Sequence, residues 1–163
     1  MRLPFESFWQ KRHVIVPLKS AHSAAAAALH VEGFHRPWTD GEFRALLAQE
    51  RVFGFAALVE GKPKAPPAGF ILARLAAGEA EILTIAVAKS VRRHGIGARL
   101  MDETLRKLHA ERAESLFLEV DAANLAAVKL YKRFGFKKAG ERPAYYEGPD
   151  GKTAALVMRL DLG

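Results

Sequence analysis

The sequence predicts a single α/β domain in which helices alternate with the strands of a central sheet. The chain has 163 residues, of which half are hydrophobic, so it can bury a core without a metal or a disulfide. Apolar segments of strand length alternate with longer segments of helical periodicity. No internal repeat and no domain boundary interrupts this order, which favours one domain over two.

The first part of the chain predicts two helices. Ser20 is suited to cap an alanine-rich helix that includes Ala24 to Ala28. A loop with Pro37 and Trp38 follows it. Thr39 or Asp40 can cap a second helix, which runs to about Gln49.

Three strands are expected next, over residues 52–59, 69–75 and 81–87. The first two are separated by a segment rich in glycine and proline and are expected to form a hairpin. In the third strand, simple alternation puts Glu81, Leu83, Ile85 and Val87 on one face. The opposite face then carries Ile82, Thr84 and Ala86.

The second half of the chain continues the alternation of helices and strands. Apolar residues recur at helical spacing from Ile96 to about Arg112. The elements expected after this helix are a short buried strand at 116–120, a helix at 124–134 that Gly135 ends, and two strands at 136–146 and 153–160.

A basic turn with two glycines joins the 81–87 strand to the long helix, in the order Arg92-Arg93-His94-Gly95-Ile96-Gly97. The first turn of a helix has free backbone N–H groups and a partial positive charge, and glycine lets an anion approach the backbone. The pattern therefore indicates a phosphate site, although a tight strand-to-helix connection without a ligand would look the same. It is not a P-loop, and Leu100 replaces the third glycine of a dinucleotide motif.

Composition excludes several classes of function. The absence of cysteine excludes thiol catalysis and disulfides, and the six histidines have no metal-ligand spacing, so no metal site is predicted. No apolar run is long enough to span a bilayer and no signal peptide is evident, so we expect a cytoplasmic protein without a membrane partner. The net charge of +7 suits an anionic ligand, but its spread along the chain predicts no direct nucleic-acid binding.

The ordered motifs resemble the GCN5-related N-acetyltransferase (GNAT) family. Residues 91–98 resemble its pyrophosphate motif, and residues 82–87 stand where its preceding strand belongs. Residues 118–124 and 130–136 resemble the second half of the family domain. The residues of these motifs, together with residues 37–39 and 142–146, most resemble the bacterial ribosomal-protein-alanine N-acetyltransferases.

This resemblance implies a GNAT fold over residues 13–161, preceded by an N-terminal extension over residues 1–12. The expected fold is a mixed, mostly antiparallel sheet of six to seven strands, splayed between the fourth and fifth strands and flanked by about four helices. It also implies acetyl-CoA as co-substrate, with the pantetheine arm on the backbone of Ile85, Ala86 and Val87. The pyrophosphate is expected on the turn from Arg92 to Ala98 (Arg92, Arg93, His94, Gly95, Ile96, Gly97 and Ala98), and Asn124, a candidate helix N-cap, is expected to contact the cofactor.

Acetyl transfer to an amine requires a base for the amine proton and an acid for the departing thiolate. Glu119 is the candidate base; it alternates away from the buried side of its strand, and the resemblance assigns the base there. Glu81 is the competing base, since many relatives carry a carboxylate on that strand and its predicted face would point it towards Ile85 and Val87. The residues alone favour a packing role for Tyr131, whereas the resemblance makes it the acid.

Trp38, Tyr145 and Tyr146 are the residues expected to line the acceptor site, although Trp38 would equally suit a packing plug. The acceptor implied is the N-terminal α-amine of a protein such as a ribosomal protein. A small amine (a polyamine, an amino acid or a drug) and a non-catalytic acyl-CoA-binding module are the alternatives. Monomer and homodimer are both compatible with the sequence.

Overall fold

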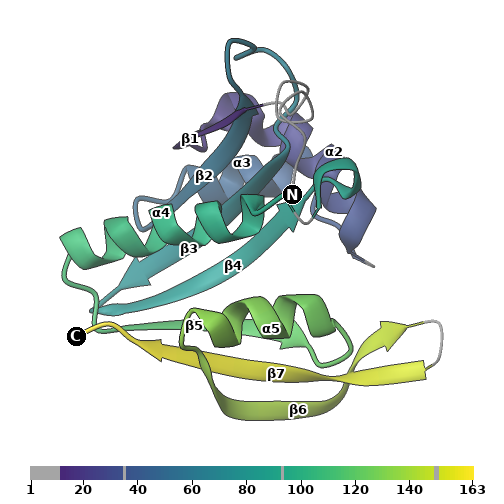
Figure 1. Cartoon of the computed structure of the whole chain (residues 1–163), viewed down its shortest axis with the longest axis vertical. Coiled ribbons are helices and arrows are strands. Elements are labelled where there is room, and N and C mark those ends of the chain that lie inside the picture. The colour runs from purple at the N-terminus through teal and green to yellow at the C-terminus, as the bar shows by residue number, and fades with distance from the viewer. Residues whose placement is uncertain (1–11, 35, 93, 149–150) are drawn as a thin grey trace, which may run out of the picture.

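A single seven-stranded sheet, with helices on both faces, organises the computed structural model (Figure 1). The structure describes residues 12–34, 36–92, 94–148 and 151–163, so Arg93 and most of the N-terminal extension lie outside the described residues. The strands follow the order β1-β2-β3-β4-β5-β7-β6. Their bounds are β1 His13–Pro17, β2 Val52–Val59, β3 Gly69–Ala76, β4 Glu79–Val87, β5 Ser115–Asp121, β6 Lys137–Gly148 and β7 Gly151–Asp161.

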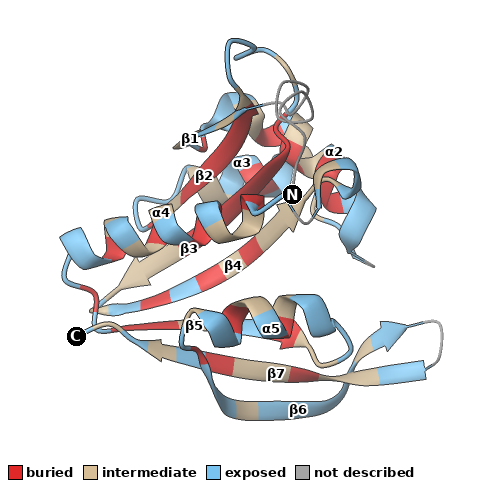
Figure 2. Ribbon diagram, in the orientation of Figure 1, coloured by how far each residue is buried: buried red, intermediate tan, exposed pale blue. Residues whose placement is uncertain are grey.

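The helices divide the core into two clusters. Their bounds are α2 Ser23–Gly33, α3 Asp40–Leu47, α4 Ile96–Ala110 and α5 Leu125–Arg133, with short 3₁₀ turns η1 at Ser20–His22 and η2 at Lys89–Val91. The helices α4 and α5 pack on one face of the sheet, through residues such as Leu100 and Tyr131. On the other face, α2 and α3 cover strands β1–β4 with Leu29 and Phe43. Strand β6 remains largely exposed (Figure 2).

The strands β4 and β5 form the one parallel pair of the sheet described, and they pair over a short length only. The paired residues are Glu79 with Ser115, Ala80 with Leu116 and Glu81 with Phe117. Beyond them β4 stays with β3, whereas β5 stays with β7. The two strands therefore diverge, which confirms the predicted splay between the fourth and fifth strands.

A β-bulge in β4 changes the face assignment made by simple alternation. Leu72 and Ala73 of β3 are consecutive, but they pair with Thr84 and Ile82, so Leu83 is an extra residue. As a result Ile82, Ile85 and Val87 pack with the α4 cluster, while Leu83 and Ala86 pack with the α2–α3 cluster. The prediction that Glu81 and Leu83 share a face with Ile85 and Val87 was wrong, because an extra residue shifts the alternation by one.

Several local predictions can be compared with the structure. The hairpin of β2 and β3 is confirmed, and Thr39 caps α3 by accepting a hydrogen bond from the Glu42 N–H at 3.2 Å. Ser20 is not a cap, because it lies inside η1 and α2 begins at Ser23 without a side-chain cap. No helix in the described part of the chain has the length and apolar character needed to cross a membrane.

Candidate active site

The end of β4 offers backbone groups on the side from which β5 has departed. The Ala88 N–H donates to the Ala68 carbonyl at 2.8 Å, which places this backbone unit on the β3 side. Backbone groups alternate in direction along an antiparallel pair. Ile85 and Val87 therefore direct their N–H and C=O groups away from β3, whereas those of Ala86 face β3.

The turn before α4 has the geometry of an anion cradle. Gly95 is the N-cap of α4 with φ 77° and ψ 11°, a left-handed conformation that favours glycine. Apart from its chain neighbours, no described residue has a heavy atom within 4 Å of the position that a Cβ on Gly95 would occupy. The amides of Ile96, Gly97 and Ala98 belong to the first helical turn, where an N–H has no acceptor within the helix. These residues fit the pyrophosphate of acetyl-CoA.

Arg92 borders this cradle and lies against β4 and α2. Its Nε–H donates to the Val87 carbonyl at 3.3 Å, and its Nη2 lies 3.6 Å from the position of a Cβ on Gly33. The exposed His94 follows it, before Gly95. Across the turn, Leu130 Cδ2 of α5 lies 3.5 Å from the position of a Cβ on Gly97. The start of α4 and the helix α5 thus meet beside the diverging strands.

Asn124 is the N-cap of α5. Its Oδ1 accepts a hydrogen bond from the Ala127 N–H at 3.2 Å, so the cap is formed. The preceding turn is fixed by Asp121, whose Oδ1 accepts hydrogen bonds from the Ala123 N–H at 2.9 Å and the Thr153 hydroxyl at 2.7 Å. The Asn124 amide nitrogen is therefore the side-chain group left to meet a ligand.

Glu119 lies on β5 two residues beyond the last pair with β4. Its side chain is 30% exposed, and its Oε1 forms an ion pair with Arg142 Nη2 of β6 at 3.1 Å. Glu81 pairs with Phe117 and so lies on the same face of the sheet, but at the end where β4 and β5 still pair. The two candidate bases therefore differ in position along the splay, and Glu119 lies in its diverged part.

Tyr131 of α5 and Tyr146 of β6 lie near each other. Tyr131 is 6% exposed and packs edge-on against Phe136, and burial, followed by the nearby Tyr146, raises the pKa of Tyr131 to about 12. Burial is also the main cause that raises the pKa of Tyr146, followed by interactions with Glu119, Tyr145 and Asp121. Both phenols therefore stay protonated at neutral pH, and both lie within electrostatic reach of the site that contains Glu119.

A wide bulge in β6 presents the tyrosines. Arg142 pairs with Ala155 and Tyr146 with Thr153, so Pro143, Ala144 and Tyr145 stand opposite a single residue of β7. Ala144 has φ 52°. The Tyr145 ring is edge-on to Tyr146 at 5.1 Å and lies 5.3 Å from the Arg142 guanidinium. The sequence analysis named both tyrosines as acceptor residues, which stays a prediction, and missed Arg142, whose partner could not be inferred without the bulge.

Trp38 lies in the aromatic cluster between α2 and α3. Its backbone N–H donates to His30 Nδ1 at 2.9 Å, and its ring stacks on His30 at 5.1 Å and lies edge-on to Phe43. His30 Nε2 is 2.9 Å from the Thr84 hydroxyl of β4. Trp38 is thus half-buried by packing, and its contact with an acceptor stays a prediction. The sequence does not indicate the role of His30 beyond its place in a predicted helix.

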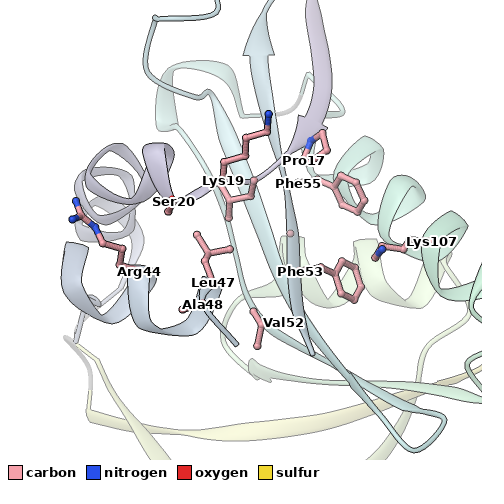
Figure 3. A pocket seen from close by; sticks show the side chains of 12 residues that line it. Pro17, Lys19, Ser20, Arg44, Leu47, Ala48, Val52, Phe53, Phe55 and Lys107 are labelled. Carbon is pink, nitrogen blue, oxygen red and sulfur yellow. The ribbon is translucent and has the colours of Figure 1, made fainter. Parts of the chain in front are cut away.

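A cavity of about 720 Å³ lies elsewhere, beside the end of β1 (Figure 3). Phe53 and Phe55 of β2 form one side, with Lys107 of α4 beyond them, while Leu47 and Arg44 of α3 form the other. The described residues that line it include no carboxylate that could serve as a base. The candidate active site is therefore the splay, where a carboxylate, phenols and an anion cradle meet. No group of three or more potential metal-ligating side chains was found among the residues described.

Comparisons with known proteins agree with this geometry. Residues 24–136 match the acetyltransferase (GNAT) family. The [ribosomal protein bS18]-alanine N-acetyltransferase of Escherichia coli K12 is 33% identical over 138 residues, which cover 83% of this chain and 90% of that protein. The crystal structure of the Escherichia coli ribosomal-protein-S18-alanine N-acetyltransferase superposes with a TM-score of 0.85 and 29% identity, covering 93% of this chain and 95% of that one. The complex of Arabidopsis thaliana NAA60 with acetyl-CoA, at 17% identity, shares the fold with a TM-score of 0.81, covering 93% and 99% of the two chains.

Proposed function

The chain belongs to the acetyltransferase (GNAT) family and is an acetyl-CoA-dependent N-acetyltransferase, and we propose that its acceptor is the N-terminal α-amine of a protein. The observation that carries this proposal is the 33% identity, over 90% of its length, to an enzyme named as the alanine N-acetyltransferase of ribosomal protein bS18. A ribosomal protein that begins with alanine is accordingly the acceptor that we propose.

Acetyl-CoA supplies the acetyl thioester that the amine attacks. The amides of the first turn of α4, with Gly95 before them, would hold its pyrophosphate, supported by Arg92. The outward-facing backbone of Ile85 and Val87 would hold the pantetheine arm, and the Asn124 amide nitrogen would contact the cofactor. Each of these groups is supported by its position beside the diverged part of β4 and β5.

Glu119 acts as the base in this proposal. The attacking nitrogen must lose a proton as the amide forms, and a partly exposed carboxylate on the diverged part of β5 can receive that proton directly or through a water. Tyr131 donates a proton to the departing sulfur, since burial keeps its phenol protonated at neutral pH. The sequence contains no cysteine for a thiol relay, and in this proposal the acetyl group passes directly to the amine.

Tyr145 and Tyr146 would flank the backbone of the acceptor peptide. The β6 bulge carries both side chains on the strand next to β7, and Tyr146 interacts electrostatically with Glu119. Trp38 would meet the acceptor from the α2–α3 loop. An acceptor amine held between these groups would lie next to the base.

A panel of acceptors tests this proposal. The protein is incubated with acetyl-CoA and three acceptors: an alanine-initiated peptide without lysine, the same peptide with a blocked α-amine and one internal lysine, and a polyamine. CoA release and mass spectrometry report the rate and the site of acetylation. We expect acetylation of the free α-amine only. Preferred acetylation of the polyamine would overturn the proposed acceptor, and CoA binding without turnover of any amine would indicate an acyl-CoA-binding module.

A further inference from the structure

Arg142 is the one cation seen in contact with Glu119 among the described residues. Its Nη2 lies 3.1 Å from Glu119 Oε1, and its guanidinium lies 5.3 Å from the centre of the Tyr145 ring. The Arg142 side chain is 56% exposed and that of Glu119 is 30% exposed, so the pair is at the surface of the site and open to an incoming molecule.

The backbone around Arg142 holds this contact in place. Arg142 pairs with Ala155 of β7, which in turn pairs with Asp121 of β5, so the guanidinium extends over a continuous three-stranded segment. The bulge follows directly and returns Tyr145 to the guanidinium. Contacts with a ring and with a carboxylate restrict the side chain, as expected for an arginine in a defined role.

The acceptor amine must enter a site in which Glu119 is already paired with Arg142. The charged and titratable groups that meet there come from three elements: Glu119 and Asp121 from β5, Tyr131 from α5, and Arg142, Tyr145 and Tyr146 from β6. An α-amine has a pKa of about 8 in water and arrives mostly as an ammonium ion at neutral pH. Glu119 alone would stabilise that ammonium ion and keep it in the form that cannot attack.

We propose that Arg142 controls the protonation of the bound acceptor amine, because its guanidinium shares Glu119 with the amine and opposes the amine's positive charge. This inference rests on the proposed function, in which Glu119 receives a proton from the attacking amine; the additional proton of the ammonium ion leaves to water before attack. Arg142 transfers no proton itself. It makes loss of the proton easier and binding of the ammonium ion weaker, since a like charge nearby disfavours the charged form.

Replacement of Arg142 by methionine therefore has opposite effects on binding and turnover. Without the opposing charge, the ammonium ion binds more tightly and gives up its proton less readily. For a shift of about one pKa unit, both KM for the acceptor and kcat at neutral pH fall about tenfold, while kcat/KM changes little. The rising limb of kcat moves to higher pH by about one unit, whereas that of kcat/KM stays in place, because the pKa of the free amine is unchanged.

The experiment compares Arg142→Met, Arg142→Lys and Lys107→Met with the parent protein, using the alanine-initiated peptide from pH 6 to 9. Lys107 is a matched control: it also contacts one carboxylate, Glu111 at 3.2 Å, and one ring, Phe53 at 5.1 Å, but it lines the cavity of Figure 3. We expect both KM for the acceptor and kcat to fall in Arg142→Met. Arg142→Lys keeps the charge and should restore the parent values. Lys107→Met should change neither constant in this way.

The outcomes separate the inference from the proposed function. A parent protein that leaves the α-amine unmodified contradicts the proposed function. Turnover by the parent together with a fall in kcat at constant or higher KM in Arg142→Met would overturn the inference alone. A thermal unfolding curve of each variant accompanies the kinetics, because loss of folded protein lowers the apparent kcat without lowering KM.

Discussion

At the scale of single residues, the buried side chain of Tyr131 suits its proposed role as proton donor. Tyr131 is 6% exposed, and its pKa is raised to about 12, first by burial. Its ring also packs against Phe136, as the helical spacing predicts for a core aromatic. The packing role and the proposed acid role are therefore compatible in one side chain.

Tyr131→Phe separates these two roles. The phenyl ring keeps the contact with Phe136, so we expect the melting temperature to change little. Loss of the proton donor should lower kcat about a hundredfold and leave KM for acetyl-CoA nearly unchanged. Steady-state kinetics of Tyr131→Phe and Tyr146→Phe test this, with Tyr146 expected to affect KM for the acceptor. A larger fall in kcat for Tyr146→Phe would move the acid role to that residue.

The two candidate bases lie on the same face of the sheet and can be compared directly. Glu119 lies in the diverged part of the splay beside Arg142, whereas Glu81 lies where β4 still pairs with Phe117. We expect Glu119→Gln to lower kcat/KM at neutral pH about a hundredfold, because the base is lost. Glu81→Gln should keep kcat/KM near the parent value. A fall of that size in Glu81→Gln alone would assign the base to β4.

At the scale of elements, the sequence predicted what depends on local pattern and missed what depends on pairing. The strand–turn–helix order around Gly95 and the cap at Thr39 follow from residue type and spacing. The bulge at Leu83 could not be predicted, because hydrophobic residues occupy both faces of β4 and alternation has no contrast there. The contact of Arg142 with Glu119 depends on a second bulge and was missed for the same reason.

The turn before α4 gives a prediction about one glycine. Gly95 and Gly61 both have φ 77°, and in the described part of the chain only their own neighbours come within 4 Å of a Cβ placed on either. Alanine at each position should therefore cost a similar free energy of unfolding, about 1 kcal/mol. Only Gly95→Ala should also raise KM for acetyl-CoA, by about fivefold or more, because relief of the strain would move the amides of the phosphate cradle.

Chemical denaturation and kinetics of the two alanine variants provide the measurement. Gly61 lies in the turn between β2 and β3, away from the splay, and serves as the matched control for backbone strain. Equal changes in KM for both variants would show that destabilisation, rather than the cradle, affects the cofactor. An unchanged KM in Gly95→Ala would remove Gly95 from the proposed site.

At the scale of the whole molecule, His30 connects parts of the fold that are far apart in sequence. It is 2% exposed and lies in α2, where its Nδ1 accepts from the Trp38 N–H. The other ring nitrogen therefore carries the proton and donates to the Thr84 hydroxyl of β4 at 2.9 Å. The rings of Phe34, Trp38, Phe43 and Phe70 surround it. The neutral imidazole thus fixes the predicted acceptor loop to the strand that precedes the phosphate turn.

Protonation of His30 should therefore destabilise the fold in mild acid. Burial lowers the pKa of His30 from 6.5 to about 4, so between these values the unfolded chain binds a proton that the folded chain does not. Stability due to the neutral imidazole is complete above pH 6.5 and is lost as the pH falls towards 4. Between pH 7.5 and 4.5 this loss amounts to about 2.5 kcal/mol. Urea denaturation of the parent and of His30→Gln over this range measures it. The variant is expected to start less stable and to lose about that much less on acidification, whereas parallel pH profiles would contradict a neutral buried His30.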